Sequence, residues 1–163
     1  MSHDDTAHEE CGVVAINDGV AIHSGDGGTS DAARAAFYAL FSLQHRGQES
    51  AGLASADGRA VRVRKGLGLV SRAFSEADVE ALTGGLAIGH TRYSTTGEPS
   101  LRNVQPFYVE TMHGPLALAH NGNLVNAAEL RRVMLERGVG LVSSSDTEVM
   151  VMMLAAARGD DWP

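Results

Sequence analysis

Residues 11–17 read CGVVAIN, a cysteine and a glycine followed by an apolar run that ends at the turn signal Asn17-Asp18-Gly19. A short apolar run bounded by turn residues predicts a buried β-strand. Cys11 is the only cysteine of the chain, so a fold built on disulfides is excluded. The residues before it, MSHDDTAHEE, are polar and acidic. The decisive feature is thus a buried strand that begins at the chain's single cysteine.

Composition and charge narrow the class of protein. The chain has 163 residues and a net charge of −7, and four of its 20 acidic residues lie in the first ten positions. The rest carries 16 acids against 13 bases, so it offers no basic excess for nucleic acid. An apolar fraction of 44% is enough for the core of one domain. No apolar run approaches the roughly 20 residues that a bilayer requires, and the acidic N-terminus is not a secretory signal. We therefore expect a cytoplasmic protein without a membrane or nucleic-acid partner.

Apolar and turn-forming segments alternate along the chain and predict further strands and helices. Two apolar runs flank Asp57-Gly58, a dipeptide that favours a tight hairpin. The predicted strands cover residues 12–17, 51–55, 60–65, 86–93 and 115–120. The predicted helices run from Asp31, capped by Ser30, to near Gly47, over residues 76–83 after Ser75, from Asn126 to Gly138, and from Ser145 toward Arg158.

The last two predicted helices begin with the spacing of a capping box. Asn126 precedes Glu129 by three residues, and Ser145 precedes Glu148 by the same interval. In the last helix an apolar stripe at helical spacing is more typical of a core than of a cofactor site. This stripe, which we expect to face the core, consists of Val149, Met152, Met153 and Ala156.

Cys11 has two interpretations. A lone cysteine is most often a small buried apolar residue. Its position after a polar segment and before a strand also suits a nucleophile that becomes the first residue after cleavage, because an N-terminal α-amino group can act as the adjacent base. Metal binding is not expected, because Cys11, His90 and His120 lack the spacing of metal ligands.

Two further motifs follow predicted strands, at residues 90–93 (HTRY) and 120–123 (HNGN). Arg92 could bind a carboxylate through its planar fork, or form an ordinary surface ion pair. The Asn121 side chain and the Gly122 N–H could form an oxyanion hole, or the two residues could be a type I′ turn. From the residues alone, both alternatives stay open for both motifs.

Taken together, five segments in this order resemble class II glutamine amidotransferase domains, and more narrowly the N-terminal part of the amidophosphoribosyltransferase family. The resemblance covers most of the chain, from Cys11 to about Glu148. Tyr93 and the sequence LQHRGQESAG favour this family over glucosamine-6-phosphate synthases. The segments are residues 9–13 (EECGV), 43–52 (LQHRGQESAG), 89–97 (GHTRYSTTG), 120–124 (HNGNL) and 145–148 (SDTE).

The resemblance implies an N-terminal-nucleophile αββα sandwich, two antiparallel sheets between helical layers. It implies that Cys11 is the nucleophile, and that Asn121 and Gly122 form the oxyanion hole. The residues that it assigns to glutamine are Arg92 and Asp146, for the α-carboxylate and the α-ammonium, and Thr95 and Gly97, in a loop that closes over the substrate. It also implies that residues 1–10 are a propeptide whose removal frees Cys11.

The implied function is ammonia production for the first step of de novo purine biosynthesis. Glutamine hydrolysis would supply ammonia to a phosphoribosyltransferase domain, which converts phosphoribosyl pyrophosphate to 5-phosphoribosylamine. That domain, with its Mg²⁺, is not in this sequence. The chain also ends before the later strands of the family's sandwich, so we expect residues 11–163 to be an incomplete amidotransferase domain. The resemblance further implies a homotetramer and, in some members, a [4Fe-4S] cluster outside this segment. An incomplete sandwich leads us to expect an exposed apolar surface or low stability in isolation.

Two other hypotheses stay open from the sequence. A non-catalytic glutamine-binding or regulatory module would keep Arg92 and Asp146 but retain residues 1–10. An ordinary Cys-His hydrolase would use His90 or His120 as its base and would not need the N-terminal segment to be removed.

Overall fold

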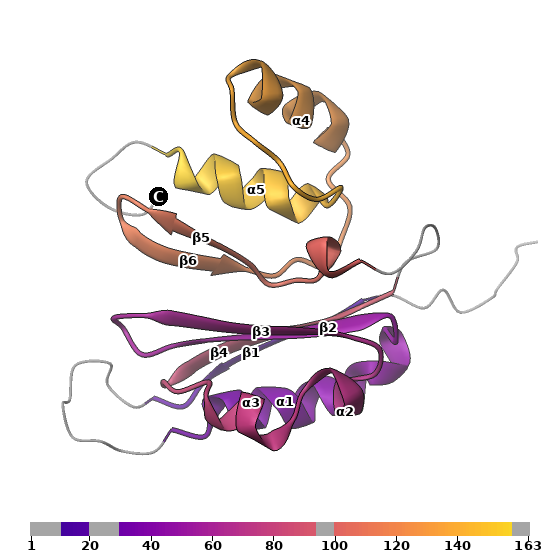
Figure 1. The fold of residues 1–163 in the computed structure, drawn as a ribbon, viewed down its shortest axis with the longest axis vertical. Coiled ribbons are helices and arrows are strands. Elements are labelled where there is room, and N and C mark those ends of the chain that lie inside the picture. Colours follow the sequence, from indigo (N-terminus) through magenta and orange to yellow (C-terminus); the bar gives the residue numbers. More distant parts are fainter. Residues whose placement is uncertain (1–10, 20–29, 94–99, 158–163) are drawn as a thin grey trace, which may run out of the picture.

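The computed structural model describes residues 11–19, 30–93 and 100–157 (Figure 1). Its larger sheet has four antiparallel strands in the order β1-β4-β2-β3. The central pair is β4 and β2, so the motif at residues 90–93 follows an inner strand and β1 lies at an edge. The bounds are β1 (Gly12–Asn17), β2 (Ser50–Ala56), β3 (Val61–Leu67) and β4 (Leu86–Arg92), which confirms four of the five predicted strands.

The predicted hairpin at Asp57-Gly58 joins β2 to β3. Gly58 has a φ of 83°, a left-handed conformation that a glycine adopts without steric cost. Asp57 Oδ1 accepts hydrogen bonds from the backbone N–H groups of Arg59 and Ala60, at 2.9 and 2.8 Å. This local chemistry fixes the register of the two strands.

Three helices cover one face of this sheet: α1 (Ala32–Leu43), α2 (Val70–Ala73) and α3 (Glu76–Glu80) (Figure 1). A 3-10 turn extends α1 to Arg46, and the segment ends at Gly47 as predicted. Ser75 and Asp78 form a reciprocal capping box on α3. The core between helices and sheet is small and apolar, built from residues such as Ala33, Ala36, Leu40, Leu53 and Val70.

A second sheet lies against the other face of the first one. It pairs β5 (Phe107–Thr111) with β6 (Gly114–Leu118), and α5 (Asp146–Ala155) covers it, with α4 (Ala127–Glu136) packed beyond (Figure 1). The order helices, sheet, sheet, helices is the αββα sandwich that the family resemblance implied. Strand β5 and helix α2 were not predicted.

Several details of the last two helices differ from the predictions. Asn126 occupies the N-cap of α4 but makes no capping hydrogen bond. Ser145 does cap α5, whereas Glu148 does not complete the box and binds elsewhere. The prediction of the buried face of α5 was largely wrong: Val149 is buried, but Met153 is 45% exposed. The helix is apolar on several sides, so spacing alone did not identify the face that packs.

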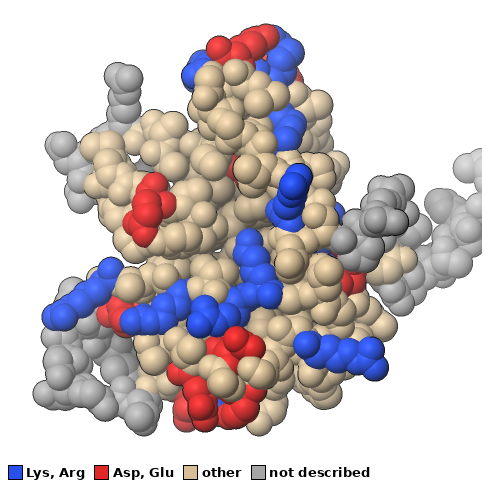
Figure 2. Space-filling view, viewed as in Figure 1, with Lys and Arg blue, Asp and Glu red and all other residues tan. Residues whose placement is uncertain are grey.

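Charged side chains form two bands on the face drawn in Figure 2. Basic groups run across the level of β3, and acidic groups lie below them near α3. Arg64 Nε lies 3.3 Å from Asp78 Oδ1, and Arg62 Nη1 lies 2.7 Å from Asp57 Oδ2. These partly exposed pairs contribute little stability because solvent screens them.

In the described part of the chain, no helix has the length and apolar character required to cross a bilayer.

Candidate active site

Cys11 lies immediately before β1, at the point where the antiparallel neighbour β4 ends. Its Sγ accepts a hydrogen bond from the Tyr93 N–H at 3.4 Å and lies 3.6 Å from the Tyr93 carbonyl oxygen, to which the thiol donates. The adjacent Gly12 N–H donates to Thr91 Oγ1 at 3.1 Å. A Cβ at Gly12 would lie 2.8 Å from that oxygen, so a larger residue next to Cys11 would require Thr91 to shift. The thiol is partly buried and anchored to backbone at the end of the sheet.

Asn121 contacts Cys11 although it follows the last strand of the second sheet in the chain. Its Nδ2 donates to the Cys11 carbonyl oxygen at 2.7 Å, and Arg46 Nε donates to the same oxygen at 3.5 Å. Gly122 lies against the His120 ring, because a Cβ at this position would be 2.8 Å from His120 Nε2. The fold therefore brings Cys11 and the Asn121-Gly122 loop together, as an active site of the predicted kind requires. Asn121 itself is exposed, so a substrate can reach it.

Arg92, the last residue of β4, pairs with Glu49, which precedes β2. Arg92 Nε lies 3.4 Å from Glu49 Oε1, and the two side chains are only 20% and 12% exposed. The Glu49 N–H also donates to the Arg92 carbonyl oxygen at 3.1 Å. Arg92 thus forms an ion pair, but a mostly buried one at the Cys11 end of β4. A guanidinium fixed on one edge keeps its direction when it meets a carboxylate.

Asp146, the first residue of α5, is attached to the loop that carries Asn121. Its Oδ2 accepts a hydrogen bond from the Leu124 N–H at 2.8 Å and lies 3.7 Å from His120 Nδ1. The backbone N–H of His120 donates to Gln105 Oε1 at 2.6 Å. Gln105 is 4% exposed and was not singled out from the sequence. Nothing in the sequence around this glutamine indicated its contact with His120.

His90 is fully buried, in register with Gly52 of the neighbouring strand. Burial, and secondarily the charge of Arg92, lower the pKa of His90 to about 4, so its ring is neutral near pH 7. Among the described residues, the Cys11 thiol forms its hydrogen bonds with the backbone N–H and carbonyl oxygen of Tyr93. That arrangement gives no support to a Cys-His pair with His90 as the base.

Some predicted features lie outside the described residues. These are residues 1–10, with the expected cleavage, and Thr95 and Gly97, with the expected closing loop. Among the described residues, no group of three or more His, Cys, Asp or Glu side chains is arranged to hold a metal ion. A [4Fe-4S] cluster does not fit this chain, because such a cluster needs several thiolates and Cys11 is the only cysteine.

Two antiparallel sheets between helical layers, with a cysteine at the start of the first strand, define the N-terminal-nucleophile class of folds. The chain belongs to the glutamine amidotransferase domain family, whose model matches residues 74–162. This confirms the family that the five sequence segments indicated.

Curated relatives and solved structures agree with this assignment. The chain is 51% identical over 152 residues to an amidophosphoribosyltransferase from Mus musculus and 49% identical over 163 residues to one from Homo sapiens. These alignments cover 90% and 95% of the chain but 28% and 31% of the relatives, so the chain spans less than a third of their length. The glutamine phosphoribosylpyrophosphate amidotransferase of B. subtilis, solved with ADP and GMP, superposes with a TM-score of 0.75 at 38% identity. That match covers 89% of this chain and 29% of the other.

Proposed function

We propose that this domain hydrolyses glutamine as the ammonia-producing part of an amidophosphoribosyltransferase, with Cys11 as nucleophile. The observation that carries the proposal is the hydrogen bond from Asn121 Nδ2 to the Cys11 carbonyl oxygen at 2.7 Å. It supports the proposal because an amide donor lies beside the cysteine that would attack the substrate. The names of the relatives support the same activity.

In the proposed mechanism, removal of residues 1–10 frees the α-amino group of Cys11. This amine takes the thiol proton, and the sulfur attacks the side-chain amide carbon of glutamine, forming a C–S bond. The Asn121 amide and the Gly122 N–H stabilise the oxyanion. The C–N bond then breaks, and the leaving nitrogen takes the proton back from the α-ammonium and departs as ammonia. Water hydrolyses the γ-glutamyl thioester, releasing glutamate and restoring the thiol.

Recognition of glutamine is proposed to depend on its two charged α-groups. Arg92 would bind the α-carboxylate, and Asp146 the α-ammonium. Both lie at the end of the sandwich where Cys11 and Asn121 meet, and each is held by another part of the chain. Thr95 and Gly97 are assigned to the closing loop by resemblance.

The fate of the ammonia is proposed from the relatives. Residues 11–163 would be the amidotransferase domain, and a phosphoribosyltransferase domain of the same protein would use the ammonia. There the nitrogen would displace pyrophosphate from phosphoribosyl pyrophosphate in a Mg²⁺-dependent step to give 5-phosphoribosylamine for purine synthesis. We propose a cytoplasmic homotetramer for the whole protein.

The test combines mass spectrometry with kinetics on protein produced from the complete gene. We expect a mature chain that begins at Cys11, releases ammonia from glutamine, and is labelled at Cys11 by a glutamine-like electrophile. A Cys11→Ala variant should lose both hydrolysis and labelling. A protein that binds glutamine but retains residues 1–10 and releases no ammonia would instead be a binding or regulatory module. Hydrolysis with residues 1–10 still attached would favour an ordinary Cys-His hydrolase.

A further inference from the structure

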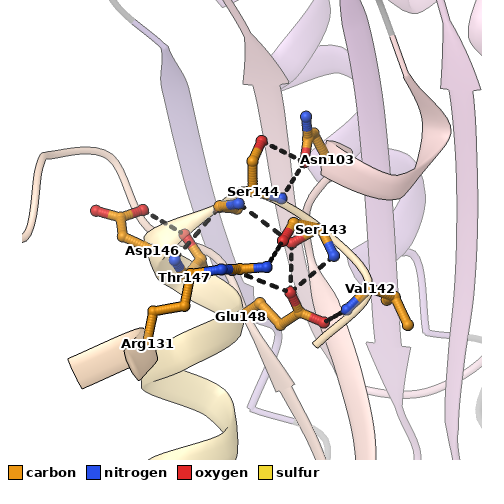
Figure 3. Close-up of polar contacts among 9 residues, drawn as sticks. Asn103, Arg131, Val142, Ser143, Ser144, Asp146, Thr147 and Glu148 are labelled. Carbon is orange, nitrogen blue, oxygen red and sulfur yellow. Dashed lines mark hydrogen bonds and ion pairs between the residues drawn. The ribbon is translucent and has the colours of Figure 1, made fainter. Parts of the chain in front are cut away.

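Glu148 is a buried carboxylate outside the proposed chemistry. It lies in the first turn of α5, and the residue is 1% exposed. Its Oε1 accepts the Val142 N–H at 2.7 Å, and its Oε2 accepts the Ser143 N–H at 2.9 Å and the Ser143 hydroxyl at 2.7 Å (Figure 3). A buried carboxylate is costly unless it is well bonded, and both oxygens of Glu148 are used.

The turn at residues 142–145 is also held from two other elements. Arg131 of α4 donates through Nη2 to the Ser143 carbonyl oxygen at 2.5 Å, and its Nη1 lies 3.9 Å from Glu148 Oε2. Asn103 Oδ1 accepts the Ser144 N–H at 3.0 Å and lies 3.3 Å from the Ser144 hydroxyl (Figure 3). We call residues 142–145 with these partners the α5 entry turn.

The α5 entry turn leads directly into Asp146. The Ser145 N–H donates to the Ser143 hydroxyl at 3.2 Å, and that hydroxyl donates to Glu148. Ser145 in turn caps the helix on which Asp146 is the first residue. A continuous chain of hydrogen bonds therefore runs from Glu148 to the backbone that sets the direction of the Asp146 side chain.

We propose that Glu148 is a positioning residue for recognition of the substrate α-ammonium, acting through the α5 entry turn on Asp146. This inference rests on the proposed function, in which Asp146 binds that ammonium. A plain helix cap accepts glutamine as readily as glutamate. Here, however, the donors Val142 N–H, Ser143 N–H and Ser143 hydroxyl face the two oxygens, so an amide NH₂ at either place would oppose at least one donor.

The discriminating experiment uses Glu148→Gln and compares glutamine with glutaramate, which has the same amide and carboxylate but no α-ammonium. Turnover is measured with the mature enzyme, and binding of both compounds is measured by calorimetry in a Cys11→Ala background. We expect kcat/KM for glutamine to fall about 10- to 100-fold, mostly through KM, with glutaramate little changed. Ser143→Ala, which removes one bond of the network, should shift the same ratio less.

Two comparisons separate positioning from loss of structure. Glu136→Gln, in the exposed Arg132–Glu136 pair of α4, is the matched control and should leave both substrates unaffected. In an Asp146→Asn background, Glu148→Gln should produce no further change in the glutamine-to-glutaramate ratio. Thermal unfolding followed by circular dichroism identifies any variant that fails to fold, in which case Ser143→Ala supplies the test.

The possible results distinguish failure of the positioning role of Glu148 from failure of the proposed function. An unchanged ratio in Glu148→Gln and Ser143→Ala, or an equal loss for both substrates, would overturn the positioning role while glutamine hydrolysis stands. A mature parent enzyme that neither binds nor hydrolyses glutamine would overturn the proposed function, and the inference with it.

Discussion

The side-chain amide of Asn121 donates a hydrogen bond to the backbone carbonyl of Cys11 at 2.7 Å, across a sequence separation of 110 residues. The two residues flank opposite sheets of the sandwich: Cys11 precedes β1, and Asn121 follows β6. Their contact connects the segments that flank the two sheets at this end of the sandwich. It also gives the Asn121 amide a fixed direction before any substrate binds, which is the condition for stabilising an oxyanion at low cost.

Replacing Asn121 by alanine should therefore lower kcat for glutamine hydrolysis by about 100- to 1,000-fold, with a small change in KM. The reason is that, in the proposed mechanism, this donor acts on charge that develops in the transition state. Steady-state ammonia release measures the effect. Asn126→Ala is the control, because Asn126 makes no capping hydrogen bond. A loss confined to KM would place Asn121 in substrate binding instead.

Replacing Arg92 by lysine should raise KM for glutamine about 10-fold or more and change kcat less. Lysine keeps the positive charge, but it loses the planar fork that can hold Glu49 on one edge and a carboxylate on another. Arg132→Lys, at an exposed site on α4, is the matched control. If KM is unchanged while the free energy of unfolding drops, Arg92 serves the ion pair and not the substrate.

His90 should make the stability of the fold depend on pH. Its pKa is about 4 in the folded chain and ordinarily 6.5, so the unfolded chain binds the additional proton between these values. The free energy of unfolding is therefore unaffected by His90 well above pH 6.5 and falls as pH decreases through 6.5 toward 4. The expected loss is about 2 kcal/mol between pH 7.5 and 5.

Urea unfolding at the two pH values, for the parent and for His90→Gln, measures this contribution. Glutamine does not titrate, so the variant should lose about 2 kcal/mol less than the parent over the same interval. Equal losses in both proteins would show that other groups cause the pH dependence.

Local chemistry explains which parts of the fold were predictable. The Asp57-Gly58 hairpin and the Ser75 cap follow from contacts within a few residues, and both were confirmed. Strand β5 was missed because the apolar segment after Pro106 is short. Its strand conformation depends on pairing with β6 and packing against α5.

The candidate site likewise contains residues that the sequence predicted and contacts that it did not. Cys11, Arg92, Asn121 and Asp146 were predicted as site residues because their residue types matched a known pattern. Their supports were not found: Gln105 bonds to a backbone N–H 15 residues away, and Glu148 looked like an ordinary helix cap. Contacts of this kind depend on tertiary packing, which leaves no periodic signal in one sequence.

Gly52 provides a test of how packing between the sheets controls the site. A methyl group at this position on β2 would overlap the carbonyl oxygen of Gln105. Gln105 would have to move. Its side chain accepts a hydrogen bond at 2.6 Å from the backbone N–H of His120, the residue before Asn121. Gly52→Ala should thus destabilise the fold by about 1–3 kcal/mol and also lower kcat.

Gly140→Ala is the matched control, because a Cβ at Gly140 meets no atom within 4 Å. It should change the free energy of unfolding by less than about 0.5 kcal/mol and leave kcat intact. Urea unfolding and ammonia release under conditions where both variants are folded separate the two effects. If Gly52→Ala loses stability but keeps its full kcat, the Asn121 loop is held independently of Gln105. A coupled loss would show that the space between the sheets sets the geometry of the Asn121 loop beside Cys11.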